Sequence, residues 1–280
     1  MQPPGSMAPA TTTTLAGGLY AETFAPTGAA KGVVLVTHGY AEHCGRYREV
    51  AHVIADAGWA VLTWDVRGHG KSPGERGYID RFSTYLTDFA VALESARRLA
   101  PTGAKTVLLG HSHGSLMTLR ALADEKPPAN IAAAIVSSPY LALRMKVPGY
   151  KKLLARVGSV IAPKLAQPNA LRVEDLTSDK QKQQERIDDK LCFDVATARW
   201  FTESSAAQDY VLAHADRIGV PTTWLVGGAD PIADPARSKL VASKMSHADY
   251  HDLAGLKHEV FNESTRGDVF DFVVRVLASV

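Results

Sequence analysis

The sequence has little cysteine, little net charge and no long apolar run. Only two cysteines, Cys44 and Cys192, occur among 280 residues. Two thiols are too few for a disulfide framework, so we expect a reducing, cytoplasmic compartment. The formal net charge is only +2, which argues against a polyelectrolyte partner, and we expect no nucleic acid to bind. No stretch of about 18 apolar residues is present, so we expect no transmembrane helix and only peripheral contact with lipid.

The first residues also lack the features of a targeting segment. Residues 1–14 contain no Lys or Arg and no apolar run, and they end in four consecutive threonines. This composition does not resemble a signal peptide, and it predicts a disordered leader. The remaining length, with 46% hydrophobic residues overall, suffices for one large core or a core with a modest insertion. No feature of the sequence specifies an oligomeric state.

The chain does have short apolar runs that alternate with helical patterns. This alternation predicts an α/β fold with a mostly parallel sheet that is flanked by helices. The expected strands are 33–37, 59–64, 106–109, 131–136, 222–226 and 249–253. The expected helices are 47–57, 82–99, 113–123, 235–244 and 264–279.

The alternation stops between residues 140 and 207, where no clear strand is visible. We expect this segment to be a helical cap, inserted into a core formed by residues 15–139 and 208–280. Its first part combines apolar residues at three- or four-residue steps with several cations and no acid, although Pro163 must bend or end the helix. The apolar positions are Val147, Tyr150, Leu154, Val157, Ile161 and Leu165, and the cations are Arg144, Lys146, Lys151, Lys152, Arg156 and Lys164. Such a helix either rests on an anionic lipid surface or simply covers a pocket and exposes its lysines.

The sequence GHSHG (residues 110–114) places Ser112 between a buried strand and a helix. Glycines on either side of a serine permit the sharp turn that lifts the hydroxyl above the sheet. The pattern alone is weak, and its alternative interpretation is a structural turn. The order Ser, Asp, His at successive strand ends strengthens it, and we predict that Ser112 is a nucleophile.

A serine hydroxyl needs a base, and His258 follows the last expected strand. His251 lies within that strand and His247 precedes it, so both are weaker candidates. The acid that orients the base is predicted to be Asp230, which follows the strand 222–226. Asp234 is the alternative acid, and its ordinary role would be to cap the next helix.

The oxyanion formed during acyl transfer requires N–H donors. One should be the backbone amide of His113, directly after the nucleophile. The other should lie in the loop after strand 33–37, where Tyr40 is the candidate.

Several other motifs have simpler explanations. His111 and His113 form a His-x-His pair, but no third ligand stands at a matching spacing, so we expect no metal. The segment RGHGKS (residues 67–72) lacks the leading glycine of a phosphate-binding loop and is expected to be a turn beneath the site. Cys44 is expected to be inert.

At these motifs the chain resembles monoacylglycerol lipases and related lysophospholipases. The shared segments are HGYAEHCGRY (38–47), DVRGHGKS (65–72), GHS (110–112), GAD (228–230) and HE (258–259). The similarity runs from about Leu19 to the C-terminus and is weakest in the cap. It implies an α/β-hydrolase fold, esterase activity on a lipid ester, no cofactor, and a cap over an acyl pocket. It also implies the roles already given to Ser112, Asp230, His258, Tyr40 and His113.

The chain departs from this family beside the nucleophile. The family usually has GHSMGG, whereas His113 and Ser115 occupy the fourth and sixth positions here. The resemblance therefore predicts a serine esterase or lipase of the monoacylglycerol lipase type, but it leaves the substrate open. Lysophospholipase, thioesterase or small-ester carboxylesterase activity would use the same residues, and a non-catalytic binding module is the alternative outside enzymes.

Overall fold

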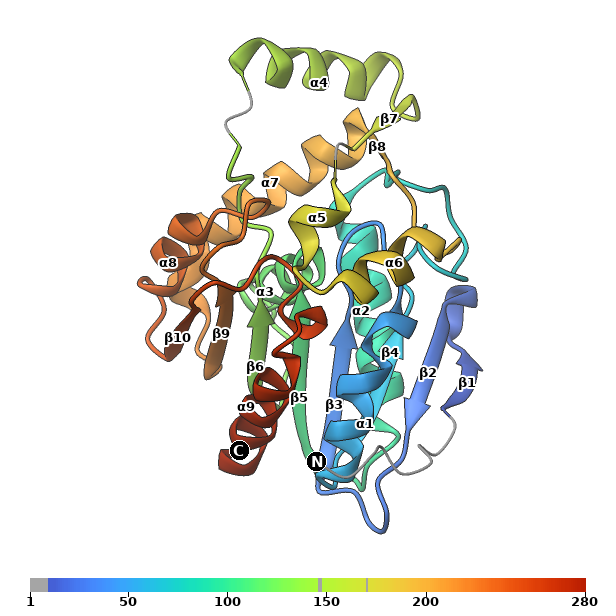
Figure 1. Ribbon diagram of the computed structural model, residues 1–280, viewed down its shortest axis with the longest axis vertical. Coiled ribbons are helices and arrows are strands. Elements are labelled where there is room, and N and C mark those ends of the chain that lie inside the picture. Colours follow the sequence, from blue (N-terminus) through green and yellow to red (C-terminus); the bar gives the residue numbers. More distant parts are fainter. Residues whose placement is uncertain (1–9, 146–147, 170) are drawn as a thin grey trace.

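The computed structural model describes residues 10–145, 148–169 and 171–280. One eight-stranded sheet forms its centre, and its spatial order is β1-β2-β4-β3-β5-β6-β9-β10 (Figure 1). The strands from β4 to β10 in this order are parallel, whereas β1 and β2 run antiparallel at one edge. The bounds are β1 (Thr11–Thr14), β2 (Tyr20–Phe24), β3 (Gly32–Thr37), β4 (Ala60–Trp64), β5 (Lys105–His111), β6 (Ile131–Ser137), β9 (Thr222–Gly227) and β10 (Ala248–Leu253).

Helices cover both faces of this sheet, which confirms the predicted α/β-hydrolase architecture. The helices α1 (Arg48–Asp56) and α9 (Arg266–Ser279) pack on one face. The opposite face is covered by α2 (Phe82–Arg97), α3 (His113–Leu122), α7 (Ala198–His214) and α8 (Pro235–Ala242).

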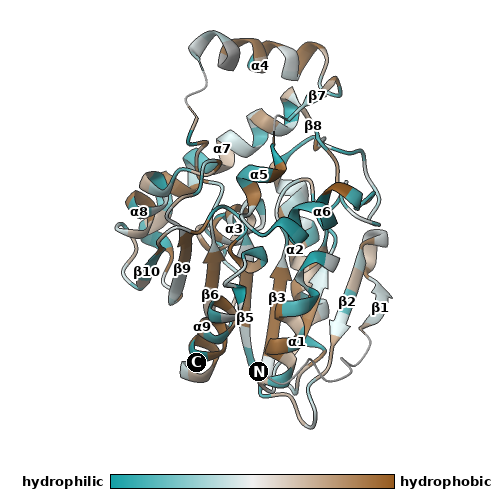
Figure 2. Ribbon diagram, in the orientation of Figure 1, coloured by the Kyte–Doolittle hydropathy of each residue, from teal (hydrophilic) through white to brown (hydrophobic). Residues whose placement is uncertain are grey.

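Successive residues of the central strands are buried in different cores. In β3, Val34 and Val36 pack with α1 and α9, whereas Val33 and Leu35 pack on the opposite face. Because both faces are buried, the strand sequence is continuously apolar rather than alternating. Figure 2 shows this as brown ribbon along β3, β5, β6 and β9, and as paler ribbon in β1 and β2.

The edge strand β1 corrects the predicted leader. Thr11–Thr14 pairs with β2, with Thr12 opposite Glu22, so the expectation of disorder over residues 1–14 is wrong for these four threonines. Residues 1–9 lie outside the described residues. Threonine is β-branched and favours strands. An all-polar run on an exposed edge, however, has no alternation of apolar and polar residues, so the sequence did not predict the strand β1.

Between β6 and β9 lies the segment that we call the cap, residues 140–207. It contains α4 (Gly149–Ile161), β7 (Ala166–Pro168), α5 (Val173–Leu176), α6 (Lys180–Asp188), β8 (Val195–Thr197) and the start of α7. The strands β7 and β8 form a small antiparallel pair, which the expectation of an all-helical segment missed. The predicted boundary at residue 207 lies inside α7, whose buried residues continue to Val211.

The first cap helix ends just before Pro163, the residue that was expected to bend or end it. α4 ends at Ile161, and Ala162 follows as its last cap residue before Pro163. Proline lacks an N–H group and its ring clashes with the preceding turn, which explains the stop. Val147 and Lys146, part of the predicted amphipathic segment, lie outside the described residues. In Figure 1, α4 lies above α7, away from the sheet.

Candidate active site

The turn after β5 holds Ser112 in a strained conformation. Its φ is +49° and its ψ is −113°, a region that residues with a side chain rarely occupy. Both flanking glycines are required by close backbone contacts. A Cβ on Gly114 would lie 2.1 Å from the carbonyl oxygen of Thr37, and one on Gly110 would lie 2.8 Å from the carbonyl of Gly114. The GxSxG pattern therefore reflects how tightly strand and helix approach each other.

The structure brings Ser112, His258 and Asp230 together at the carboxyl ends of the strands. The Oγ of Ser112 lies 2.9 Å from Nε2 of His258, and Nδ1 of His258 lies 2.7 Å from Oδ2 of Asp230. An Nδ1–H group that donates to this carboxylate leaves Nε2 free to accept the serine proton. All three side chains are buried, with Ser112 the most exposed at 6%.

Backbone amides fix the carboxylate of Asp230. Its Oδ1 accepts hydrogen bonds from the N–H groups of Ile232 (2.7 Å) and Ala233 (3.0 Å), so only Oδ2 faces His258. The turn after β9 thus orients the acid before any ligand binds.

The alternative candidates lie elsewhere. Oδ1 of Asp234 accepts from the amide of Ala236, 3.0 Å away, as the N-cap of α8. His251 lies on β10 beside Asp249, and His247 is exposed in the turn before that strand. None of these three residues joins the group around Ser112.

The charge of Asp230 controls the protonation of His258. Burial opposes the imidazolium, but the carboxylate of Asp230 and its hydrogen bond outweigh burial, so the pKa of His258 is raised. The two histidines beside Ser112 behave differently. Burial, with the neighbouring His258, lowers the pKa of His111 to about 4, and burial, with His38, lowers that of His113 to about 3.

These shifts predict the pH dependence of activity. A base must be neutral to accept a proton, so kcat/KM should fall as pH drops through the raised pKa of His258. The acid limb should therefore have its midpoint above about 6.5, the ordinary histidine value. Measurement of kcat/KM for a water-soluble ester from about pH 5 to about pH 9 tests this. A midpoint below that value would mean that Asp230 does not stabilise the imidazolium.

Of the two expected oxyanion donors, His113 follows Ser112 at the start of α3, and Tyr40 lines the same cavity as Ser112. Among the residues that the structure describes, the amides of Tyr40 and His113 donate no hydrogen bond to a protein acceptor. The side chain of Tyr40 is held separately, since its hydroxyl donates to the carbonyl of Val195 in the cap at 2.6 Å. Within the described part of the chain, the assignment of these two amides as oxyanion donors stays a prediction.

Sequence reasoning gave no role to the carboxylates next to this site. Glu42 accepts hydrogen bonds from the amide of Gly39 (2.6 Å) and the hydroxyl of Tyr47 (2.7 Å). Arg46 lies between Glu42 and Glu259, at 3.1 Å and 2.5 Å. This buried network holds the loop that carries Tyr40. Its residues belong to the segments that show the family resemblance, which was the signal available in the sequence.

Several motifs prove to be structural. The ring of His113 packs against Phe82, Tyr85 and Trp200, with centroids 5.2–5.7 Å apart, rather than beside the ring of His111 in a metal site. The RGHGKS turn folds around Asp65, whose Oδ2 accepts from the amide of Lys71 at 2.7 Å. Cys44 is buried, and burial raises the pKa of its thiol.

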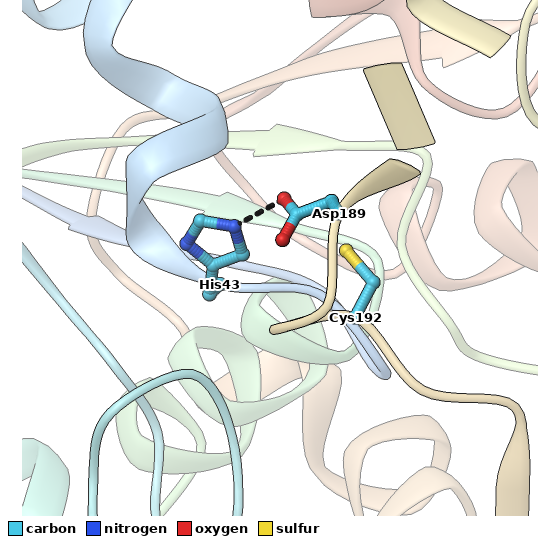
Figure 3. A group of neighbouring side chains, drawn as sticks. All are labelled: His43, Asp189 and Cys192. Atoms are coloured by element: carbon cyan, nitrogen blue, oxygen red, sulfur yellow. Dashed lines mark hydrogen bonds and ion pairs between the residues drawn. The ribbon is translucent and has the colours of Figure 1, made fainter. Parts of the chain in front are cut away.

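One group of potential metal ligands joins the cap to the core. His43, Asp189 and Cys192 have ligand atoms within 4.8 Å of one another (Figure 3). Nδ1 of His43 accepts from the amide of Gly45, so Nε2 carries the proton that it donates to Asp189 at 2.6 Å. Burial raises the pKa of the Cys192 thiol to about 12. Two ligand atoms would have to lose protons before a cation could bind, so the arrangement favours a hydrogen bond between cap and core.

A cavity of about 140 Å³ opens beside Ser112 and His258. The cap supplies most of its apolar wall. The apolar and aromatic lining residues are Tyr40, Tyr140, Leu143, Leu171, Leu176, Ala196, Trp200, Phe201 and Ile232. The polar lining residues apart from Ser112, His111 and His258 are Glu42, Asn169, Arg186 and Glu259.

Known proteins are similar to this chain over most of its length. Among curated relatives, the phospholipase YtpA of Bacillus subtilis is 29% identical over 241 residues, which cover 85% of this chain and 92% of the relative. The monoacylglycerol lipase of Mycolicibacterium smegmatis is 29% identical over 262 residues, 89% of each chain.

Among solved structures, the monoacylglycerol lipase of Paleococcus ferrophilus superposes with a TM-score of 0.84 at 29% identity, over 93% of this chain and 98% of that one. A monoglyceride lipase variant of Saccharomyces cerevisiae superposes with a TM-score of 0.82 at 19% identity, over 98% of this chain and 96% of that one. This likeness supports the fold. The family model described as "Serine aminopeptidase, S33" matches residues 28–265. The chain therefore belongs to this S33 family (Hydrolase_4) of α/β hydrolases.

Proposed function

We propose that this protein is a serine esterase that hydrolyses monoacylglycerol-type esters through an acyl-enzyme intermediate. The observation that carries the proposal is the hydrogen-bonded series Ser112, His258 and Asp230 at the wall of a mainly apolar cavity. The relatives named monoacylglycerol lipase support the substrate class.

The reaction would use only groups of this chain. The hydroxyl of Ser112 attacks the ester carbonyl while Nε2 of His258 takes its proton. The amides of Tyr40 and His113 stabilise the resulting oxyanion. His258 then donates the proton to the leaving alcohol. Water next attacks the acyl-enzyme while His258 takes a proton from it, and His258 returns that proton to Ser112 as the fatty acid leaves. No cofactor or metal ion takes part in these steps.

The acyl chain would lie against the aromatic and aliphatic wall. Tyr140, Leu143 and Phe201 line both this cavity and a neighbouring one of about 590 Å³ beneath the cap. Each methylene buried there contributes about 0.8 kcal/mol. A chain that extends from Ser112 along these three residues would thus gain affinity with length, up to the part of the second cavity that Arg156, Asp209, Asp234 and Arg237 line.

A panel of substrates tests the proposal. We expect the highest kcat/KM for glycerol esters, rising with acyl length until the cavity is filled. Lysophospholipids, thioesters, short alkyl esters and an aminoacyl anilide serve as comparisons. Absence of hydrolysis of every ester by folded protein, together with no labelling of Ser112 by a fluorophosphonate, would refute the proposal and favour a binding module.

The exposed face of α4 suggests how a lipid substrate reaches the cavity. Within the part of the chain that the structure describes, no helix is long and apolar enough to cross a membrane. Yet α4 exposes several large apolar side chains by 47–77%: Tyr150, Leu153, Leu154, Val157, Val160 and Ile161. Figure 2 shows apolar residues along this helix, remote from the sheet. We propose that this face, which belongs to a segment with six cations and no acid between residues 144 and 164, rests on anionic lipid.

Charges placed on this face of α4 should weaken its binding to lipid. The double substitution Leu154→Asp and Ile161→Asp is expected to weaken binding to anionic vesicles at least about tenfold, since each buried side chain contributes about 1.5–3 kcal/mol. Hydrolysis of a soluble short-chain ester should not change. Leu240→Asp is the matched control, because Leu240 is 48% exposed on α8, outside the cap. Equal vesicle binding by the wild type and the double variant would contradict the proposal.

A further inference from the structure

The loop that follows β3 contains a strained residue directly after Tyr40. Ala41 has a φ of +62° and is completely buried. Residues with a Cβ rarely occupy this left-handed region, and such strain persists only where neighbouring groups fix the backbone. A relaxed Ala41 would change the course of the chain at Tyr40, whose amide is the predicted oxyanion donor. The contacts that hold Ala41 therefore bear on the position of that donor.

The cap supplies the contacts to Ala41. Its carbonyl oxygen accepts a hydrogen bond from Nη1 of Arg186 on α6 at 2.6 Å, and another from the amide of Phe193 at 3.3 Å. The hydrogen bond from the guanidinium is the shorter one, and a charged donor makes it the stronger one. The start of the same loop is held from the core, because Glu42 accepts from the amide of Gly39 at 2.6 Å. The loop that carries Tyr40 is thus held from both sides.

The positive charge of Arg186 is balanced within this part of the molecule. Arg186 is only 9% exposed, and it lines the same cavity as Glu42 and Glu259. These two carboxylates carry two negative charges, and Arg46, which contacts both, supplies one positive charge. A buried cation is tolerated where nearby anions offset its charge. Arg186 supplies the second positive charge, so its guanidinium can stay charged while it donates to a backbone carbonyl.

The helix that carries Arg186 is attached to the core at two other places. Nζ of Lys182 lies 2.5 Å from Oε1 of Glu49 on α1. Nη1 of Arg266 on α9 lies 3.0 Å from Oδ2 of Asp179, the N-cap of α6. Neither ion pair involves the loop that carries Tyr40. Because α6 is fixed independently, replacing Arg186 should leave the helix in place and change the loop alone.

We propose that Arg186 is a positioning residue, which holds Ala41 so that the amide of Tyr40 faces the oxyanion formed at Ser112. This inference rests on the proposed esterase function, and it gives the cap a part in catalysis besides covering the cavity. The oxyanion exists only after the serine has attacked the carbonyl. A misplaced donor therefore slows the chemical step and has little effect on the affinity for the ester itself.

Arg186→Met tests the proposal, because methionine keeps an apolar stem and removes the guanidinium. On the soluble ester p-nitrophenyl hexanoate, we expect kcat to fall roughly 10-fold to 100-fold, somewhat less than after complete loss of one oxyanion donor. KM should stay within about threefold of the wild-type value. Arg186→Lys retains a charged donor and should recover part of kcat. Arg172→Met is the matched control, since Arg172 is an arginine of the same cap whose side chain is 72% exposed, and both constants should be unchanged.

A pair of ketones separates positioning from a general loss of structure. Pentyl trifluoromethyl ketone adds to the hydroxyl of Ser112 and so places an oxyanion where the ester reaction forms one. The corresponding methyl ketone binds without this addition. Arg186→Met should raise the inhibition constant of the trifluoromethyl ketone by about the factor by which it lowers kcat/KM, because both depend on the same donor. The inhibition constant of the methyl ketone should not change.

The outcomes distinguish this inference from the proposed function. If the folded wild type neither hydrolyses any ester nor binds the trifluoromethyl ketone, the esterase assignment itself fails. If the wild type is active and Arg186→Met keeps the wild-type kcat, the positioning role is refuted. A raised KM with unchanged kcat would mean that Arg186 binds the substrate, and a lowered kcat without weaker binding of the trifluoromethyl ketone would mean that it does not act through the oxyanion. Both results would overturn the proposal. If Arg186→Met does not fold, Arg186→Gln replaces it in the same comparisons.

Discussion

Replacing Ser112 with alanine is expected to lower kcat for ester hydrolysis by about 10⁶. The substitution removes the only atom that would bond to the acyl group, and its Oγ lies 2.9 Å from the base His258. The fold should persist, because alanine keeps the backbone at φ +49° no worse than serine does. The measurement is kcat on a soluble ester, with loss of fluorophosphonate labelling as a second readout.

His258→Ala provides the control for this prediction. Residues that act as one unit show non-additive losses, so the double variant should be about as slow as either single variant. Additive losses would mean that the two side chains act independently, contrary to their hydrogen bond. Activity above about 1% in a Ser112→Ala preparation free of wild-type enzyme would show that another group is the nucleophile.

Asp230→Asn should lower kcat by about 10⁴, the loss known for this change in serine hydrolases. The amides of Ile232 and Ala233 donate to Oδ1, so they would bind the oxygen of the new amide. Its NH₂ group would then point at Nδ1 of His258 and force the proton onto Nε2. A base with a proton on Nε2 cannot accept the proton of Ser112. Steady-state kinetics on the folded variant would measure the effect.

Asp234→Asn is the matched control for Asp230→Asn. Asp234 caps α8 through a hydrogen bond to the amide of Ala236. Asparagine caps a helix about as well as aspartate, so rate and stability should barely change. A large loss of kcat in Asp234→Asn with little loss in Asp230→Asn would reverse the assignment of the acid.

The fold was predictable where local patterns reflect burial. The run at residues 33–37 is apolar on both faces because β3 is covered by helices on both sides. The edge strand β1 was missed because its threonines are exposed and carry no apolar alternation. The pair β7–β8 was missed because three residues per strand are too few to form a pattern.

The sequence by itself determined the order of elements, the class of fold, and Ser112, Asp230 and His258 as candidates. These conclusions follow from local signals: strand periodicity, the glycines of the turn, and polar residues at strand ends. Only the tertiary structure decided that Asp230 rather than Asp234 faces His258.

Only the tertiary structure also showed that Arg186 and Asn169 line the cavity beside Ser112. These residues lie more than fifty positions from Ser112, and no spacing relates them to it. Their placement depends on how the cap packs over the sheet. That packing depends on many contacts between segments that are distant in the sequence, so no single segment predicts it.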